Sequence, residues 1–336
     1  MNKSDEKNYL SLTHFFSKAL FLGIGIAKII MDAKTNAIYS MILGTILGTI
    51  ILYFINKLNY NNMNNIKKII MFILIYILFI IGINELTNLI TSIYLIDSNN
   101  FFVMLPLIIV ILYINTKNIT INIKIAHILL FLFNAFFLIC FISLIPEIDT
   151  LNYLPLFNLN IKNILFTSLE FALFSVTPNI LYGGIKYNKD INNKIIKNYI
   201  ISNIVIILMI LTTTGVLGYE LVNLFKYPEY VVLKKISLLD FINNIENILS
   251  FCIIFALFIF LSICSKQLYD ISENTFNNKY IYPIFLIISL YFISITLFDN
   301  IIFFILTSKY LWLICLIILI IYILTNINTL FNKQKK

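Results

Sequence analysis

A pair of glycines interrupts an apolar run near the start of the chain. Residues 21–30 read FLGIGIAKII, so Gly23 and Gly25 are followed by Lys28 inside a run long enough to cross a bilayer as a helix. Glycine weakens a helix interior, and unwound backbone is tolerated at membrane depth only where it is buried in protein or lines a cavity. The spacing therefore predicts a helix break at which bare backbone meets a small polar ligand.

Two alternatives stay open for this stretch. Glycines in membrane helices also serve close helix packing, which is the interpretation we favour for Gly44 and Gly48 in ILGTILGTI. Lys28 either extends toward the outer surface or acts as a counter-charge at the site.

Three acids fall inside apolar runs, where an ionisable group costs roughly 2.5–3.5 kcal/mol on insertion scales. They are Glu85, Glu170 and Glu246. Each is a candidate for ligand binding or ion coupling, and the alternative is a carboxyl group in the bundle interior that is protonated or paired with a lysine.

A second interruption is predicted around Glu170. Thr167 and Ser168 precede it, and residues 175–179 read SVTPN. Serine and threonine compete for backbone hydrogen bonds and proline removes a donor, so this run has the ingredients of a discontinuous helix.

The composition indicates an all-α integral membrane protein. Hydrophobic residues make up 60% of the 336 residues and charged residues only 12%, whereas a soluble domain has about 25% charged residues. Alternating segments of roughly ten residues, typical of a β-barrel, do not occur. Apolar runs predict ten transmembrane helices, at about 11–31, 36–56, 66–95, 100–115, 122–145, 161–183, 195–220, 240–264, 280–298 and 301–326.

Lysines supply the orientation. All 24 basic residues are lysine, and 16 of them fall on the segments that are inside when the N-terminus is cytoplasmic. Basic residues concentrate on the cytoplasmic side of membrane proteins, so both termini are expected to be cytoplasmic. Residues 221–236 are expected outside, as a short helix at the membrane interface.

The predicted helices divide into two sets of five. Residues 1–336 then form a single transmembrane domain without a soluble domain, with a first repeat at about 11–145 and a second at about 161–326. The two interrupted helices are the first and sixth, which are corresponding members of the two halves, as expected of inverted-repeat transporters.

Several function classes are disfavoured. The uniform use of lysine looks like genome bias, so no nucleic-acid partner is expected. The four cysteines lie in apolar runs without metal-ligand spacing, and we expect neither a metal site nor a cofactor. An enzyme acting on lipid-linked substrates would need clustered catalytic side chains or a large loop, so we expect no enzyme activity.

Three stretches resemble the B subunit of spore germination nutrient receptors, a branch of the amino acid/polyamine/organocation transporter superfamily. The first is FLGIGIAKIIMDAKTNAIYSMILGTILG, similar to the family's first two helices. The second is LPLFNLNIKNILFTSLEFALFSVTPNIL, similar to its sixth helix and the loop before it. The third is FKYPEYVVLKKISLLDFINNIENILSFCIIFALFIFLS, which resembles its tyrosine-proline loop, short helix and eighth span.

The resemblance implies a LeuT-like fold of two inverted five-helix repeats, located in the spore inner membrane or a cell membrane. It implies a pocket for an amino-acid-type nutrient between the first and sixth helices, and assembly with A-type and C-type receptor subunits. The pocket residues it implies are Gly23, Ile24, Gly25, Thr167, Ser168 and Glu170. Glu85 and Glu246 remain, from their positions in apolar runs, candidate coupling or structural acids.

Other functions remain open at this point. The same scaffold suits a proton- or sodium-coupled amino acid or amine transporter, with Glu85 or Glu170 as proton carrier. A purely structural membrane subunit with a degenerate pocket would have a similar sequence.

Overall fold

The computed structural model describes residues 3–58, 65–96, 98–115, 119–154, 160–184, 192–236, 245–276, 282, 284, 286 and 300–326. Every regular element among these residues is helical. The α-helices are α1 (Lys3–Lys18), α2 (Ile26–Ala33), α3 (Ala37–Lys57), α4 (Asn65–Ile93), α5 (Asn100–Asn115), α6 (Ile119–Leu144), α7 (Ile161–Val176), α8 (Asn192–Val222), α9 (Pro228–Leu233), α10 (Ile245–Phe276) and α12 (Asn300–Asn326). Short turns of other helix types are η1 (Phe21–Gly25), η2 (Lys34–Asn36), η3 (Ile145–Glu147), η4 (Thr150–Tyr153) and η5 (Thr177–Gly184).

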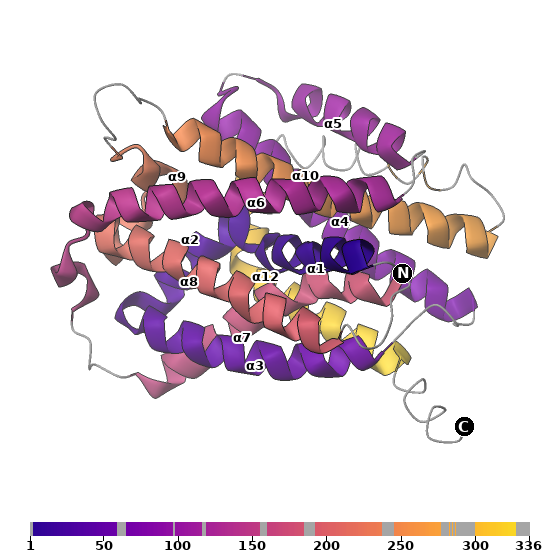
Figure 1. The fold of residues 1–336 in the computed structure, drawn as a ribbon, viewed down its shortest axis with the longest axis horizontal. Helices are drawn as coiled ribbons and strands as arrows, with labels where there is room; N and C mark the ends of the chain where they lie inside the picture. The colour runs from indigo at the N-terminus through magenta and orange to yellow at the C-terminus, as the bar shows by residue number, and fades with distance from the viewer. Residues whose placement is uncertain are drawn as a thin grey trace.

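The long helices lie side by side as a bundle (Figure 1). Within the described residues, seven segments are long and apolar enough to cross a membrane, and Asn100–Ile114 is a shorter apolar helix. The chain is thus a helical, multi-pass integral membrane protein. The predicted ninth span, 280–298, lies almost wholly outside the described residues.

One predicted boundary is wrong by about three turns. The eighth span was expected to end near residue 264, but α10 continues to Phe276. Its extension carries buried polar side chains, including Ser265, Gln267 and Ser272. A helix can continue past the point where its apolar run ends, because protein packing there replaces contact with lipid.

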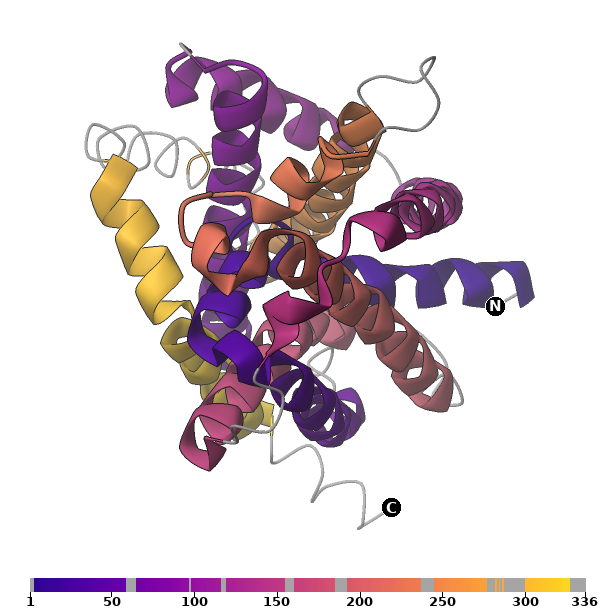
Figure 2. The same ribbon diagram turned by 90° about the vertical axis from the view of Figure 1, so that its left-hand side faces the viewer.

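Helices α1 and α2, which together cover the predicted first span, lie in the interior of the bundle. Helix α1 packs against α6, α7, α8 and α10, and α2 continues it toward the end of the bundle where α9 lies (Figures 1 and 2). The chain then turns at Lys34, which has a positive φ of 50°, and α3 runs back along the bundle (Figure 1).

Helices α3 and α7 approach closely at two glycines. A Cβ atom on Gly44 would lie 2.8 Å from the Ser168 carbonyl oxygen and 2.9 Å from the Phe171 side chain. A Cβ atom on Gly48 would overlap the hydroxyl of Tyr199 on α8. The predicted packing role of Gly44 and Gly48 is confirmed, and this contact fixes the position of α7 in the bundle.

Candidate functional site at the broken first helix

The first span is broken where the sequence predicts it. Leu22 has φ −70° and ψ 100°, and Gly23 has φ 123° and ψ −84°, so neither residue is helical. A φ of 123° is open to glycine and strained for residues with a Cβ atom. Gly23 therefore allows the chain to leave α1 and start α2 in a shifted register.

Gly25 has a different role from Gly23. Its φ of −65° and ψ of −36° are helical, and it is the N-cap of α2. A Cβ atom there would overlap the Leu20 carbonyl oxygen, so Gly25 is required by close backbone approach inside the turn. Ile24 lies between them in η1, and its side chain is outside the described set.

Glu85 of α4 lies directly against the break. A Cβ atom on Gly23 would be 2.7 Å from its Oε2 atom, and only 4% of the residue is exposed. Within the described residues, neither of its carboxylate oxygens has a hydrogen-bond partner. The predicted intramembrane acid and the predicted break are therefore adjacent, although 62 positions of sequence separate Gly23 from Glu85.

A second buried acid at the break was missed by the sequence analysis. Glu229 is on the short helix α9, is 5% exposed, and has no hydrogen-bond partner for either oxygen in the described part of the chain. Burial raises the pKa of Glu229 to about 8, while the backbone amides of Glu229 itself and of Gly23 act in the opposite direction. The Gly23 amide thus lies near this carboxyl group, outside hydrogen-bonding geometry.

Two neighbours of Glu229 also lie near Glu85. Burial and the Glu85 carboxylate raise the pKa of the Tyr227 hydroxyl well above its ordinary value. Burial lowers the pKa of Lys226, and the Glu85 carboxylate partly offsets this effect. The start of α9 therefore brings one cation, one phenol and one carboxyl group to the break in the first span.

The third acid, Glu170, has a different environment. It is fully buried on α7, and its Oε1 atom lies 3.7 Å from the Lys28 Nζ atom of α2. Lys28 also forms an ion pair of 2.6 Å with Asp32 one turn further along. Lys28 does not extend into open surroundings, since its side chain is 13% exposed, and it acts as a counter-charge between the first and sixth spans.

Thr167 and Ser168 of α7 lie where this helix meets α3. The Thr167 hydroxyl lies 2.6 Å from the Ser40 hydroxyl and also donates to the Asn163 carbonyl. The Ser168 hydroxyl donates to the Leu165 carbonyl, and its own carbonyl faces Gly44. The hydrogen bonds of Thr167 and Ser168 are thus made within α7 itself and with α3.

The sixth span changes helix type where an interruption is predicted. Helix α7 ends at Val176 and continues as the 3₁₀ segment η5 from Thr177 to Gly184. On its other side, α7 meets the first break through aromatic rings, with Phe21 at 4.9 Å from Phe171 and 5.9 Å from Phe174 between ring centroids. These three rings fill the contact between the broken turn and the sixth span.

Glu246 belongs to the first turn of α10, and its side chain is outside the described set. Across the described residues, no three His, Cys, Asp or Glu side chains are grouped closely enough to hold a metal ion. No known protein family model matches the chain, and no curated protein matches it.

Proposed function

We propose that the chain is the nutrient-sensing subunit of a spore germination receptor and binds an amino-acid-type ligand between its first and sixth spans. The sequence resemblance supports the receptor assignment. The observation that carries the binding proposal is the break at Leu22 and Gly23, which frees backbone groups in the interior of the bundle.

The chemistry of the two spans suits a zwitterion. The N-terminus of α2 begins at the break, and a helix N-terminus favours a carboxylate group. Glu170 and the hydroxyls of Thr167 and Ser168 belong to the facing helix and suit an ammonium group. Lys28 neutralises Glu170 when no ligand is bound.

Ligand entry requires the aromatic contact to separate. Phe21 lies against Phe171 and Phe174, so the ligand would occupy a state in which these rings move apart. A ligand shifts an equilibrium only by its differential affinity for the two states. In this proposal, the separated state is the one that passes the signal to A-type and C-type partner subunits.

The first test is thermal unfolding of the purified protein across a panel of amino acids. A ligand at 100 times its dissociation constant stabilises by about 2.7 kcal/mol. We expect one or a few amino acids to raise the melting temperature of the native chain and not that of Glu170→Gln. Glu147→Gln is the matched control, because Glu147 is exposed in η3.

A uniform absence of stabilisation across the panel would contradict the binding proposal.

The second candidate is a coupled transporter of amino acids or amines. It is favoured by Glu85 and Glu229, two buried carboxyl groups without hydrogen-bond partners in the described residues, since such groups serve proton and ion coupling in membrane proteins. Gradient-dependent uptake of the stabilising amino acid into proteoliposomes would favour transport. Ligand-dependent rearrangement of partner subunits without uptake would favour sensing.

A further inference from the structure

Lys28 contacts two acids, and the two contacts differ in kind. Its Nζ atom donates a hydrogen bond of 2.6 Å to Asp32 on the next turn of α2. The same atom lies 3.7 Å from the Oε1 atom of Glu170, which is close enough for an ion pair and too long for a hydrogen bond. The Asp32 and Glu170 carboxylates are also close enough to interact electrostatically. The three side chains therefore form one cluster, in which Lys28 is hydrogen-bonded to Asp32.

Glu170 keeps its capacity to accept hydrogen bonds. It is fully buried on α7, and neither of its carboxylate oxygens has a hydrogen-bond partner in the described part of the chain. Unused acceptors on a buried carboxylate are costly, so this group suits a donor that arrives with a ligand. Lys28 compensates the charge of Glu170 from a distance of 3.7 Å and leaves the acceptor positions open.

The position of Asp32 is fixed by the helix that carries Glu170. The side-chain amide of Asn163, in the first turn of α7, donates to the main-chain carbonyl of Asp32 at 2.8 Å. Asn163 lies two helical turns before Glu170 and on the same face of α7. Asp32 is therefore anchored to α7 as well as to α2, and this anchor holds the Lys28–Asp32 pair at a set distance from Glu170.

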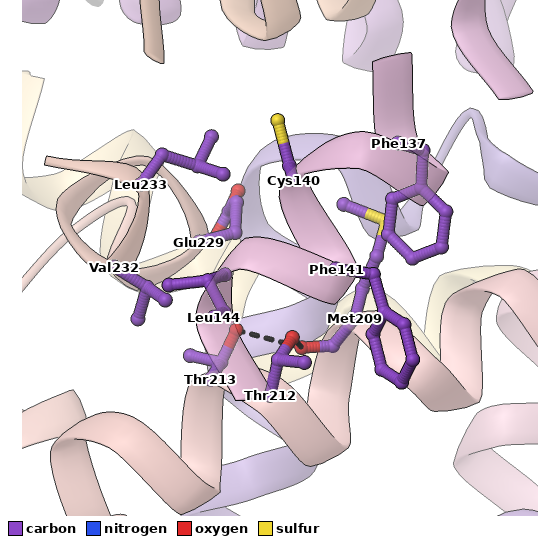
Figure 3. Close-up of a pocket in the computed structure, with 10 residues that line it drawn as sticks. All are labelled: Phe137, Cys140, Phe141, Leu144, Met209, Thr212, Thr213, Glu229, Val232 and Leu233. Atoms are coloured by element: carbon purple, nitrogen blue, oxygen red, sulfur yellow. Dashed lines mark hydrogen bonds between the residues drawn. The ribbon is translucent and has the colours of Figure 1, made fainter. Parts of the chain in front are cut away.

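The cavity between α6, α8 and α9 is not an alternative site for an amino acid. Its lining is mostly apolar, and Glu229, Thr212 and Thr213 supply its polar groups (Figure 3). It has room for about one water molecule, which is too small for an amino acid. The open acceptors of Glu170 are therefore the groups that we assign to a ligand ammonium.

We propose that Asp32 is a positioning residue of the nutrient pocket, because it holds the Lys28 ammonium off the acceptor positions of Glu170 so that a ligand ammonium can occupy them. This inference rests on the proposed function and extends it to a residue that acts through Lys28. Without Asp32, the Lys28 ammonium would close the gap of 3.7 Å to about 2.8 Å and bond Glu170 directly. A tethered ammonium has a high effective concentration and would compete strongly with the ligand.

The first test measures affinity. The twenty common amino acids are titrated one by one against the purified native chain and its variants, with the melting temperature as the signal. For the amino acid that binds the native chain most tightly, Asp32→Asn should raise the dissociation constant by about tenfold or more, because the ligand must then break a direct Lys28–Glu170 bond. Asp32→Glu keeps a carboxylate at the same spacing and should bind within about threefold of the native chain.

A second comparison tests whether Asp32 acts through Lys28. In the Lys28→Met background the competing ammonium is absent, so Asp32→Asn should leave the dissociation constant unchanged. A tenfold loss of affinity that persists in this background would overturn the positioning role, since Asp32 would then act on the ligand directly. Native affinity in Asp32→Asn itself would overturn it as well.

A third measurement needs no ligand. In Asp32→Asn, Lys28 bonds Glu170 directly, so adding Glu170→Gln should lower the melting temperature by about 2–4 °C more than it does in the native background. Equal effects of Glu170→Gln in the two backgrounds would overturn the proposal. If the effects differ as expected and no amino acid binds the native chain, the proposed function fails while the hold of Asp32 on Lys28 stands.

The matched control for Asp32→Asn is Asp270→Asn. Asp270 forms an ion pair of 3.2 Å with Lys266 at the same i, i+4 spacing, on α10. Its substitution removes an equivalent helical pair outside the Glu170 cluster. We expect it to change neither the dissociation constant nor the effect of Glu170→Gln on the melting temperature.

Discussion

Two groups of buried acids in the same bundle differ in their partners. Glu170 of α7 has Lys28 of α2 at 3.7 Å, and this pair joins the first span to the sixth. Glu85 and Glu229 lie at the break in helix α1–α2, and within the described residues neither forms an ion pair. All three acids are buried and lack hydrogen-bond partners in the described part of the chain, so burial alone does not distinguish an acid that has a counter-charge from one that has none.

The largest effect is expected from removing the counter-charge of Glu170. Lys28→Met leaves a buried carboxylate without compensation, which costs about 3–5 kcal/mol when a buried pair is broken from one side. The double variant Lys28→Met/Glu170→Gln should recover much of this loss. Melting temperatures of the single and double variants check the prediction, and a double variant no more stable than Lys28→Met would contradict the pairing.

For Glu229, removal of the acid is expected to stabilise the protein at high pH. The folded state holds the Glu229 proton up to a pKa of about 8, whereas an unfolded chain releases it near 4.5. Between these values the unfolded state binds fewer protons, so stability falls as pH rises, by about 1.4 kcal/mol per pH unit.

Glu229→Gln removes this contribution. The variant should therefore gain stability relative to the native chain as pH rises from 6 to 8, by about 2–3 kcal/mol. Melting temperatures in choline chloride across this range are the measurement, with Glu147→Gln as control. Parallel pH profiles for native and Glu229→Gln would show that the pKa of Glu229 is not raised in the folded state.

Lys18 is a buried cation that can be compared with the buried acids. It is 2% exposed, its Nζ atom has no hydrogen-bond partner in the described part of the chain, and it lies 4.3 Å from the centroid of the Phe133 ring. Since Met has a similar shape and no charge to desolvate, Lys18→Met should stabilise by about 1–2 kcal/mol. A lower melting temperature for this variant at pH 7 would reveal a charged partner of Lys18.

The smallest effect is expected at Thr167, beside Glu170. Thr167→Val loses the hydroxyl contact with Ser40 at 2.6 Å, worth about 0.5–1.5 kcal/mol. Thr45→Val is the control, because Thr45 is half-buried on α3 and its hydroxyl donates to the Ile42 carbonyl of its own helix. Equal melting temperatures for the two variants would show that the α3–α7 bond contributes nothing.

The features predictable from the sequence were local ones. The apolar runs predict most helices because a bilayer requires about 20 apolar residues per span. Gly23 predicts the break, since few other residues adopt its φ of 123°. The four-residue spacing of Gly44 and Gly48 predicts a packing face, which the contacts with α7 and α8 confirm.

The features that were missed depend on distant segments. Glu229 follows Pro228 in a polar connection, where a glutamate is ordinary, and only the fold buries it beside Gly23. The contact of Thr167 with Ser40 of α3 likewise depends on the close approach of α3 and α7 at Gly44. The expected role of Thr167 and Ser168 at the ligand pocket stays a prediction. The Lys28–Asp32 ion pair is an exception among the missed features, because it is local. Its i, i+4 spacing is that of a helical ion pair and could have been recognised in the sequence.

The central claim is that a nutrient binds at the broken first helix, and amide hydrogen exchange tests it most directly. The purified protein is compared with and without a mixture of the common amino acids, and exchange is followed in residues 20–26 and 164–176. The proposed site predicts slower exchange in both segments when the mixture is present. Unchanged exchange in both segments, or protection confined to other helices, would contradict it.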